Sequence, residues 1–175
     1  WNHVMRRPMS IASQENDEIS IIYKSIGQGT HIMANWQKEE IVDIIGPLGN
    51  YWQGYENSYP ILIGGGVGIA PILNLHHLLN NKKINHMLIM GARNQREHFL
   101  QHEPEKHIYM STDDGSMGIY GNVVDALQKI LPNGNHPLKC KIYSCGPPMM
   151  MESVRIYSLQ KDLNCNLALE TIMAC

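Results

Sequence analysis

The sequence is poor in aromatic residues, in excess charge and in long apolar runs, and each shortage excludes a class of protein. One Phe stands against eleven Met, whereas proteins that bind single-stranded nucleic acid need aromatic faces on which bases stack. The formal net charge of −2 gives no support to a polyanionic ligand. The longest uncharged apolar stretch, residues 60–73, is too short and too rich in glycine to span a bilayer. We therefore predict neither a nucleic-acid partner nor a membrane span.

The cysteines form neither a CxxC pair nor a compact disulfide framework; they are Cys140, Cys145, Cys165 and Cys175. No charged segment followed by an apolar region opens the sequence, so we expect no signal peptide. In a chain of this size without a secretory segment, thiols are by default reduced and cytosolic. These features predict a cytoplasmic protein.

The first 55 residues have the pattern of β-structure. β-Branched runs at 19–24 and 40–45 predict two strands, and the glycine-containing segments 27–30 and 46–50 predict turns. The polar and aromatic segment 51–59 has no clear period, so we interpret it as a linker.

From residue 60 the pattern changes to strands that alternate with helices. The expected strands are 60–63, 86–90, 107–111, 141–144 and 167–169. One helix is expected directly after residue 68, and two others at 123–131 and 149–160. Such alternation is typical of parallel βαβ units and predicts a doubly wound sheet. The predicted fold class is therefore an α/β domain preceded by a smaller β unit.

Two glycine-containing turns lie where predicted strands lead into helices. Gly64-Gly65-Gly66-Val67-Gly68 follows the first strand of the α/β pattern, and Ser144-Cys145-Gly146-Pro147-Pro148 follows a later one. Glycine lets the backbone approach a pyrophosphate, and the helix start supplies free N–H groups. The first segment alone is equally compatible with an ordinary tight turn, and a Cys at position 145 is more often a small buried apolar side chain than a working thiol. Two such turns on one edge favour a shared nucleotide ligand.

Two polar segments are further candidates for ligand binding. Asp113 and Asp114, after the strand that ends at Ser111, could accept hydrogen bonds from an adenosine ribose and would repel a 2′-phosphate. The alternative is an Asx turn with a solvated charge. In Arg6-Arg7-Pro8-Met9-Ser10, an Arg could hold a phosphate and the Ser hydroxyl a heteroatom. A solvated pair of Arg side chains is the alternative there.

Together and in this order, the segments resemble the ferredoxin–NADP reductase superfamily, and within it the electron-transfer subunits of NAD-linked dihydroorotate dehydrogenase. The stretches that carry the resemblance are 7–11, 27–30, 46–50, 64–71, 112–116, 145–150, Leu169-Glu170 and Met173-Ala174-Cys175. They cover nearly the whole chain. The resemblance implies three parts: a partial antiparallel FAD-binding barrel at 1–55, an NAD-binding α/β domain at 56–168, and the start of a [2Fe-2S] segment at 169–175.

The resemblance also implies roles for individual residues. Ser10 would lie at the redox-active edge of the flavin and Cys145 near the nicotinamide, so these two are the candidate catalytic residues. The other residues implied to contact FAD are Arg7, Pro8, Met9, Ile22, Tyr23, Lys24, Gly29 and Thr30. Those implied to contact NAD(H) are Gly65, Gly66, Gly68, Asp113 and Gly146. Cys175 would be the first of four thiolate ligands of the cluster, a full set of which this sequence lacks.

The function implied is electron transfer between NAD(H) and a catalytic, FMN-containing dihydroorotate dehydrogenase subunit in pyrimidine biosynthesis, through FAD and the [2Fe-2S] cluster. Both the first barrel strands and the remaining cluster cysteines are missing, so we expect the natural chain to be longer. Two alternatives stay open: a related reductase subunit serving a hydrogenase or a ferredoxin, and a nucleotide-binding module without catalysis. The aspartates at 113 and 114 favour NAD over NADP.

Overall fold

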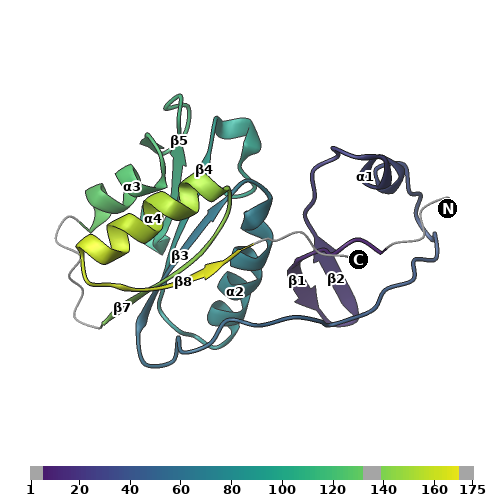
Figure 1. The fold of residues 1–175 in the computed structure, drawn as a ribbon, viewed down its shortest axis with the longest axis horizontal. Helices are drawn as coiled ribbons and strands as arrows, with labels where there is room; N and C mark the ends of the chain where they lie inside the picture. Colours follow the sequence, from purple (N-terminus) through teal and green to yellow (C-terminus); the bar gives the residue numbers. More distant parts are fainter. Residues whose placement is uncertain (1–5, 132–138, 170–175) are drawn as a thin grey trace.

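The computed structural model describes residues 6–131 and 139–169. A small N-terminal unit lies beside an α/β unit, and the two are joined by a long connecting segment (Figure 1). The arrangement agrees with the predicted order of a β unit followed by an α/β domain.

The α/β unit is built on a six-stranded parallel sheet. Its strands are β3 (Tyr59–Gly65), β4 (Met87–Ala92), β5 (Ile108–Thr112), β6 (Ile119–Tyr120), β7 (Cys140–Cys145) and β8 (Asn164–Ala168). The strand order is β6-β5-β4-β3-β7-β8. The chain therefore enters the sheet at β3, runs outward to β6 and then returns to place β7 on the other side of β3. This is the doubly wound arrangement that the alternation of strands and helices predicts.

Helices cover both faces of this sheet. The helices of the α/β unit are α2 (Ile69–Asn81), α3 (Val123–Ile130) and α4 (Pro148–Gln160), with the 3₁₀ turns η1 (Gly66–Gly68), η2 (Gln95–Glu97) and η3 (Pro104–Lys106). Side chains of β3 alternate between the faces: Ile61 and Ile63 pack with α3 and α4, whereas Leu62 packs with α2. Because a shift by one residue would exchange the two apolar cores, this alternation fixes the strand register.

The N-terminal unit contains an antiparallel pair, β1 (Ile11–Glu15) and β2 (Glu18–Ile21), and the short helix α1 (Gln28–Met33). Several expectations for this unit need correction. The strand expected at 19–24 ends at Ile21, and its partner β1 lies in a segment for which no strand was predicted. The turn expected at 27–30 is instead the start of α1, because the Thr30 hydroxyl caps that helix.

The strand expected at 40–45 is absent, since this segment has no regular secondary structure. Ile41 is 101% exposed and Ile44 63% exposed. A strand needs a neighbour for its backbone hydrogen bonds, and among the described residues none pairs with this segment. It is tied down instead by Arg6, whose guanidinium lies 2.6 Å from a carboxylate oxygen of Asp43.

The connecting segment 51–58 is more than a passive linker, because it packs along the α/β unit. Tyr55 is buried with the side chains of α2, and the Lys82 ammonium donates to its hydroxyl at 3.2 Å. The indole N–H of Trp52 donates to the carbonyl of Pro71 in α2 at 3.2 Å. The segment thus fixes where the N-terminal unit meets the α/β unit.

Candidate functional site

The candidate site lies at the carboxyl edge of the sheet, where β3 and β7 end side by side. Gly64 of β3 pairs with Cys145 of β7. After β3 the chain turns to the α2 face, whereas after β7 it turns to the face of α3 and α4. A crevice between strands whose connections diverge in this way is the usual ligand site of an open α/β sheet.

The turn from β3 to α2 approaches the end of β7 so closely that only glycine fits. A Cβ atom at Gly68 would lie 2.5 Å from the carbonyl carbon of Cys145 and 2.5 Å from the amide nitrogen of Gly146. Gly66 adopts a φ of +56°, a conformation that favours glycine. Gly65 is buried, and Met150 of α4 occupies the space into which its Cβ would project. The four residues predicted at this edge, Gly65, Gly66, Gly68 and Gly146, are therefore brought together.

Two helices begin at this edge, but they offer few backbone N–H groups: the Ile69 amide donates to the carbonyl of Gly66, and Pro71, Pro147 and Pro148 have no N–H. In the described part of the chain, no side chain caps the start of α2 or of α4, and neither first turn contains an acidic residue. The remaining N–H groups and the positive end of the helix dipole suit a phosphate. The residues present therefore fit a dinucleotide with its pyrophosphate at the start of α2.

Cys145 is buried at the end of β7, with 3% of its surface exposed. Its neighbour Gly146 is half-buried, and a Cβ there would lie 3.1 Å from the Gly65 carbonyl oxygen. At this position Cys145 belongs to the apolar core on the α2 side of the sheet. The structure thus places the thiol at the predicted edge and gives it a packing role.

In the N-terminal unit, the guanidinium of Arg7 lies over the start of α1. A Cβ at Gly29 would be 3.2 Å from Arg7 Nε. The hydroxyl of Thr30 is already engaged: it donates to the Gly27 carbonyl at 3.0 Å and accepts from the amides of Ile26 and Gly27. Arg7, Gly29 and the first amides of α1 are therefore together, whereas the Thr30 hydroxyl is engaged in capping the start of α1.

The remaining residues predicted to line the flavin flank the β1–β2 pair. Pro8 and Ser10 are exposed and Met9 is half-buried immediately before β1, while Ile22, Tyr23 and Lys24 follow β2, with Lys24 exposed. Hydrogen bonding by Arg93 lowers the pKa of Glu97 in the α/β unit, and the positive charge of Lys24 lowers it by a smaller amount. Ile22 packs against the apolar core on the α2 side of the sheet, so the flank that follows β2 reaches the α/β unit.

The ribose candidates follow β5. Asp114 accepts from the amide of Ser116 at 2.9 Å, which is the Asx-turn alternative, and hydrogen bonding by Ser116 lowers its pKa. Asp113 is exposed, and its charge helps to raise the pKa of Arg93. The side chain of Asp113 remains available for a ligand, whereas Asp114 shapes the loop.

Sequence reasoning missed an ion pair beside these aspartates. The Arg93 guanidinium donates to the Glu97 carboxylate through Nε at 2.9 Å and also through an Nη atom. This bonding, followed by the charge of Glu97, raises the pKa of Arg93. The pair lies in a bend and the 3₁₀ turn η2, so the helical spacing rule gives no signal for it in the sequence. Next to the pair lies a pocket of about 370 Å³ lined by Asn94, Gln95, Arg96, Asp114 and Ser116.

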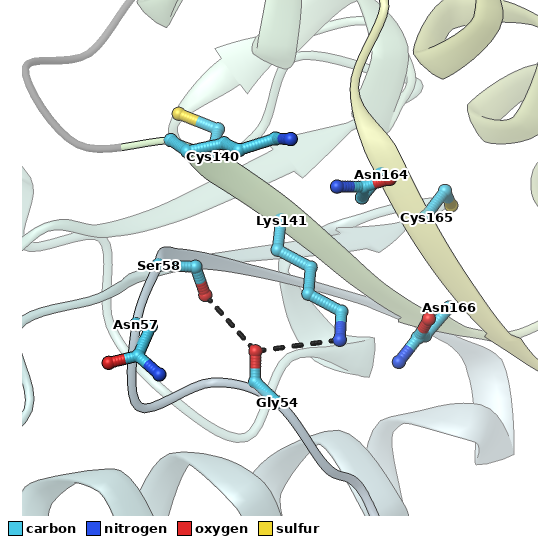
Figure 2. A pocket seen from close by; sticks show the side chains of 9 residues that line it. Gly54, Asn57, Ser58, Cys140, Lys141, Asn164, Cys165 and Asn166 are labelled. Atoms are coloured by element: carbon cyan, nitrogen blue, oxygen red, sulfur yellow. Dashed lines mark hydrogen bonds between the residues drawn. The ribbon is translucent and has the colours of Figure 1, made fainter.

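A larger pocket, of about 410 Å³, lies at the opposite, amino edge of the sheet (Figure 2). It opens beside the starts of β3, β7 and β8. Its best-placed cation, Lys141, is already occupied, because Nζ donates to the carbonyls of Gln53 and Gly54. The pocket is remote from the carboxyl edge and forms no part of the candidate site.

Comparison with known proteins identifies the family of the chain and its NAD-binding domain. A family model of the oxidoreductase NAD-binding domain matches residues 62–155, which include both glycine turns. Over 99% of its length the chain is 36% identical to the electron-transfer subunit of dihydroorotate dehydrogenase B (NAD⁺) of Fusobacterium nucleatum, and it covers 68% of that protein. The corresponding subunit of Streptococcus pneumoniae is 31% identical, with 70% of its length covered.

The chain belongs to the electron-transfer subunits of dihydroorotate dehydrogenase B.

Solved structures agree with this assignment. A flavin-based, NADH-dependent reduced ferredoxin–NADP oxidoreductase aligns with 96% of this electron-transfer subunit, with a TM-score of 0.79 and 26% identity. The chain covers 62% of that protein. The flavohaemoglobin-like domain of nitric oxide dioxygenase from Vibrio cholerae, 19% identical with a TM-score of 0.71, shares the fold. The sequence therefore spans about two thirds of the length of its relatives.

Two predictions for this electron-transfer subunit concern features that the comparisons leave open. Cys175, the predicted cluster ligand, lies outside the described residues, and across 6–131 and 139–169 no three His, Cys, Asp or Glu side chains gather as a metal site. Over the same ranges, no helix has the length and apolar character needed to cross a bilayer.

Proposed function

We propose that this chain carries electrons between NAD(H) and a catalytic dihydroorotate dehydrogenase subunit, through FAD and a [2Fe-2S] cluster, in pyrimidine biosynthesis. The observation that carries the proposal is the carboxyl edge of β3 and β7, where glycine turns and two uncapped helix starts meet next to the N-terminal unit. When bound, FAD would exchange two electrons at a time with NAD(H) and one electron at a time with the next carrier. The chain supplies binding, orientation and exclusion of water.

For NAD(H), the proposed roles follow from the backbone. The glycine turn of Gly65, Gly66 and Gly68, together with the positive end of the α2 dipole, would hold the pyrophosphate, and Gly146 would let the nicotinamide lie close to the end of β7. Cys145, buried next to Gly146, would pack behind the backbone that contacts the nicotinamide. Since its thiol is buried, we assign it to shaping the nicotinamide site, with no proton transfer.

For FAD, Arg7 and the first amides of α1, including those of Gly29 and Thr30, would hold the phosphates. Pro8, Met9, Ile22, Tyr23 and Lys24 would line the cofactor on both flanks of the β1–β2 pair. The exposed hydroxyl of Ser10 would hydrogen-bond the redox-active edge of the flavin. Ser10 is thus the side chain that we assign to the isoalloxazine ring of the flavin.

We further propose a preference for NAD over NADP. Arg93 is held by Glu97, which has the largest part in raising its pKa, and the charge of Asp113 adds a smaller effect. A 2′-phosphate would therefore meet the Asp113 carboxylate without a free Arg93 to offset the repulsion, whereas a ribose hydroxyl can donate to Asp113.

The cluster and the partner complete the proposal. Cys175 would be one of four thiolate ligands of the [2Fe-2S] cluster, the others being supplied by a continuation of the chain. The catalytic subunit would contain FMN and receive or return electrons through that cluster. A cytoplasmic location stays a prediction from the sequence.

The test is made with the full-length protein, alone and with its co-purified partner. NADH is expected to bleach the flavin absorption within seconds, and NADPH to do so at least tenfold more slowly at equal concentration. With the partner present, dihydroorotate is expected to reduce NAD⁺. A flavinated complex that NADH reduces but dihydroorotate does not would favour the hydrogenase or ferredoxin alternative. A colourless protein that binds NADH would favour the non-catalytic module.

A further inference from the structure

Helix α2 is hydrogen-bonded to the N-terminal unit and to the connecting segment through one stripe of its surface. The amide group of Asn74 donates to the backbone carbonyl of Ile11 at 3.2 Å. One turn earlier, the carbonyl of Pro71 accepts from the indole of Trp52, also at 3.2 Å. Pro71 and Asn74 are three residues apart and so lie on the same side of α2. The connecting segment and the N-terminal unit therefore meet this side of the helix, and Figure 1 shows the N-terminal unit next to α2.

The two ends of this connection are the two halves of the proposed site. Ile11 directly follows Ser10, the residue assigned to the flavin edge, and is the first residue of β1. Helix α2 begins at the glycine turn that is assigned to the dinucleotide. The hydrogen bond between Asn74 and Ile11 therefore joins the segment assigned to the flavin to the helix that follows the dinucleotide-binding turn.

Trp52 is itself held firmly from the sheet side. The edge of its ring meets the ring of Tyr143 at 5.6 Å between centroids, with an interplanar angle of 89°. The Tyr143 hydroxyl and the Lys141 ammonium both donate to the carbonyl of Gln53, each at 2.9 Å. Figure 2 shows the Lys141 side chain reaching across to Gly54, the next residue. Burial raises the pKa of Tyr143 to about 12, so its hydroxyl keeps the proton that it donates.

We propose that Asn74 and Trp52 are positioning residues that set the separation of the flavin edge from the nicotinamide. The proposal rests on the proposed function. Neither side chain is assigned a contact with the reacting atoms. Asn74 acts by fixing the N-terminal unit against α2, and Trp52 by fixing the connecting segment that leads from that unit. Reacting atoms must approach to roughly 3–3.5 Å, and a displacement of about 1 Å can cost roughly 10²-fold in rate. Loosening either bond should therefore slow electron transfer while leaving the dinucleotide site on the α/β unit unaltered.

The experiment measures flavin reduction by NADH in full-length Asn74→Asp, Trp52→Phe and wild-type protein by stopped-flow absorbance. In this reaction NADH gives up a hydride and becomes NAD⁺, and the flavin takes the hydride with one proton from water. Asp has the shape of Asn but presents oxygen to the Ile11 carbonyl, and Phe keeps the contact with Tyr143 without the indole N–H. Both variants are expected to reduce at least tenfold more slowly at saturating NADH, with Kd for NADH within twofold of wild type.

A readout independent of activity accompanies the kinetics. Hydrogen exchange at the amides of residues 11–15 is expected to rise in Asn74→Asp, while exchange within β3 and α4 stays unchanged. Asn81→Asp, which adds the same charge at the exposed end of α2, is the matched control and should behave as wild type in both measurements. Asn74→Ala serves as a second variant, neutral and without the donor.

The outcomes separate the two proposals. Wild-type protein that NADH does not reduce would overturn the proposed function. Wild-type protein that is reduced normally, together with Asn74→Asp and Trp52→Phe proteins of unchanged rate and exchange, would overturn the positioning role alone. An equal loss in the Asn81→Asp control would also overturn it, because the effect would then come from charge on α2.

Discussion

Gly68 illustrates how a single residue decides whether the two turns of the candidate site can meet. Its neighbours are the backbone of Cys145 and Gly146, which cannot move aside as the end of a flexible side chain can. The β3–α2 turn and the end of β7 are in contact because this position lacks a Cβ. The requirement is steric and local, so substitutions here should affect both folding and dinucleotide binding.

We expect Gly68→Ala to lower the free energy of unfolding by about 2 kcal/mol, as overpacking of a core does. It should also weaken NADH binding at least tenfold, because the turn must withdraw from β7. Denaturant unfolding and fluorescence titration with NADH measure the two effects. Gly27→Ala is the control, since nothing lies within 4 Å of a Cβ at Gly27 and its φ is −115°. Equal stability of the two variants would show that the contact at Gly68 relaxes without cost.

At the scale of elements, helix α3 has its start specified by its own residues. The Asn122 side chain accepts from the amides of Val124 and Asp125 at 2.8 and 3.2 Å, and the Asp125 carboxylate accepts from the Asn122 amide at 2.8 Å. This reciprocal capping box makes the boundary of α3 readable from sequence, and the helix expected at 123–131 is found at Val123–Ile130.

Asn122→Ala is expected to destabilise the protein by about 1 kcal/mol, because two amides at the start of α3 lose their acceptor. Asn122→Gly should cost only a few tenths of a kcal/mol, since glycine leaves these amides open to water. Thermal or urea unfolding of the three proteins provides the measurement. If alanine and glycine proved equally harmful, the loss would have to come from packing of Asn122, with no part for the cap.

Elements without such local signals were the ones that the sequence failed to predict. Segment 40–45 has the β-branched composition of a strand, but a strand exists only when another strand supplies its hydrogen bonds, and among the described residues none does. Conversely, β1 (Ile11–Glu15) has a polar sequence and forms because β2 and α2 lie against it. In both cases the deciding partners are distant in sequence.

At the scale of the whole molecule, a buried histidine pair links α2 to the segment before β4. His86 Nδ1 donates to the Ile84 carbonyl at 2.8 Å, so its Nε2 accepts from His76 Nδ1 at 2.7 Å. His76 Nε2 then accepts from the Asn80 amide at 3.1 Å. Every ring nitrogen is satisfied only when both rings are neutral and these side chains keep their orientation. Burial first, and then the charges of His86 and His77, lower the pKa of His76 to about 4.

The free energy of unfolding should therefore fall as pH decreases from 6.5 to about 4. In this window the unfolded chain takes up a proton at position 76 that the folded chain refuses, and the loss reaches about 3 kcal/mol at most. Above pH 6.5 this contribution to stability is fully present. Urea unfolding at pH 7.5, 6.5, 5.5 and 4.5 tests the slope, which His76→Gln should flatten. His31→Gln, on an exposed side chain, should keep the wild-type slope; identical slopes in all three proteins would assign acid sensitivity to other groups.

The sequence by itself determined the alternation of strands and helices, the two glycine turns and the family, because periodicity, caps and turn chemistry are properties of neighbouring residues. It therefore predicted the doubly wound sheet and the edge at which Gly68 and Gly146 lie. Only the tertiary structure decided that the Thr30 hydroxyl is consumed by its own turn, that Glu97 holds Arg93, and that Asn74 reaches Ile11. These interactions depend on the positions of hydrogen-bonding groups in the folded chain. A residue pattern carries no such information until the sheet and its helices have brought those groups within about 3 Å of each other.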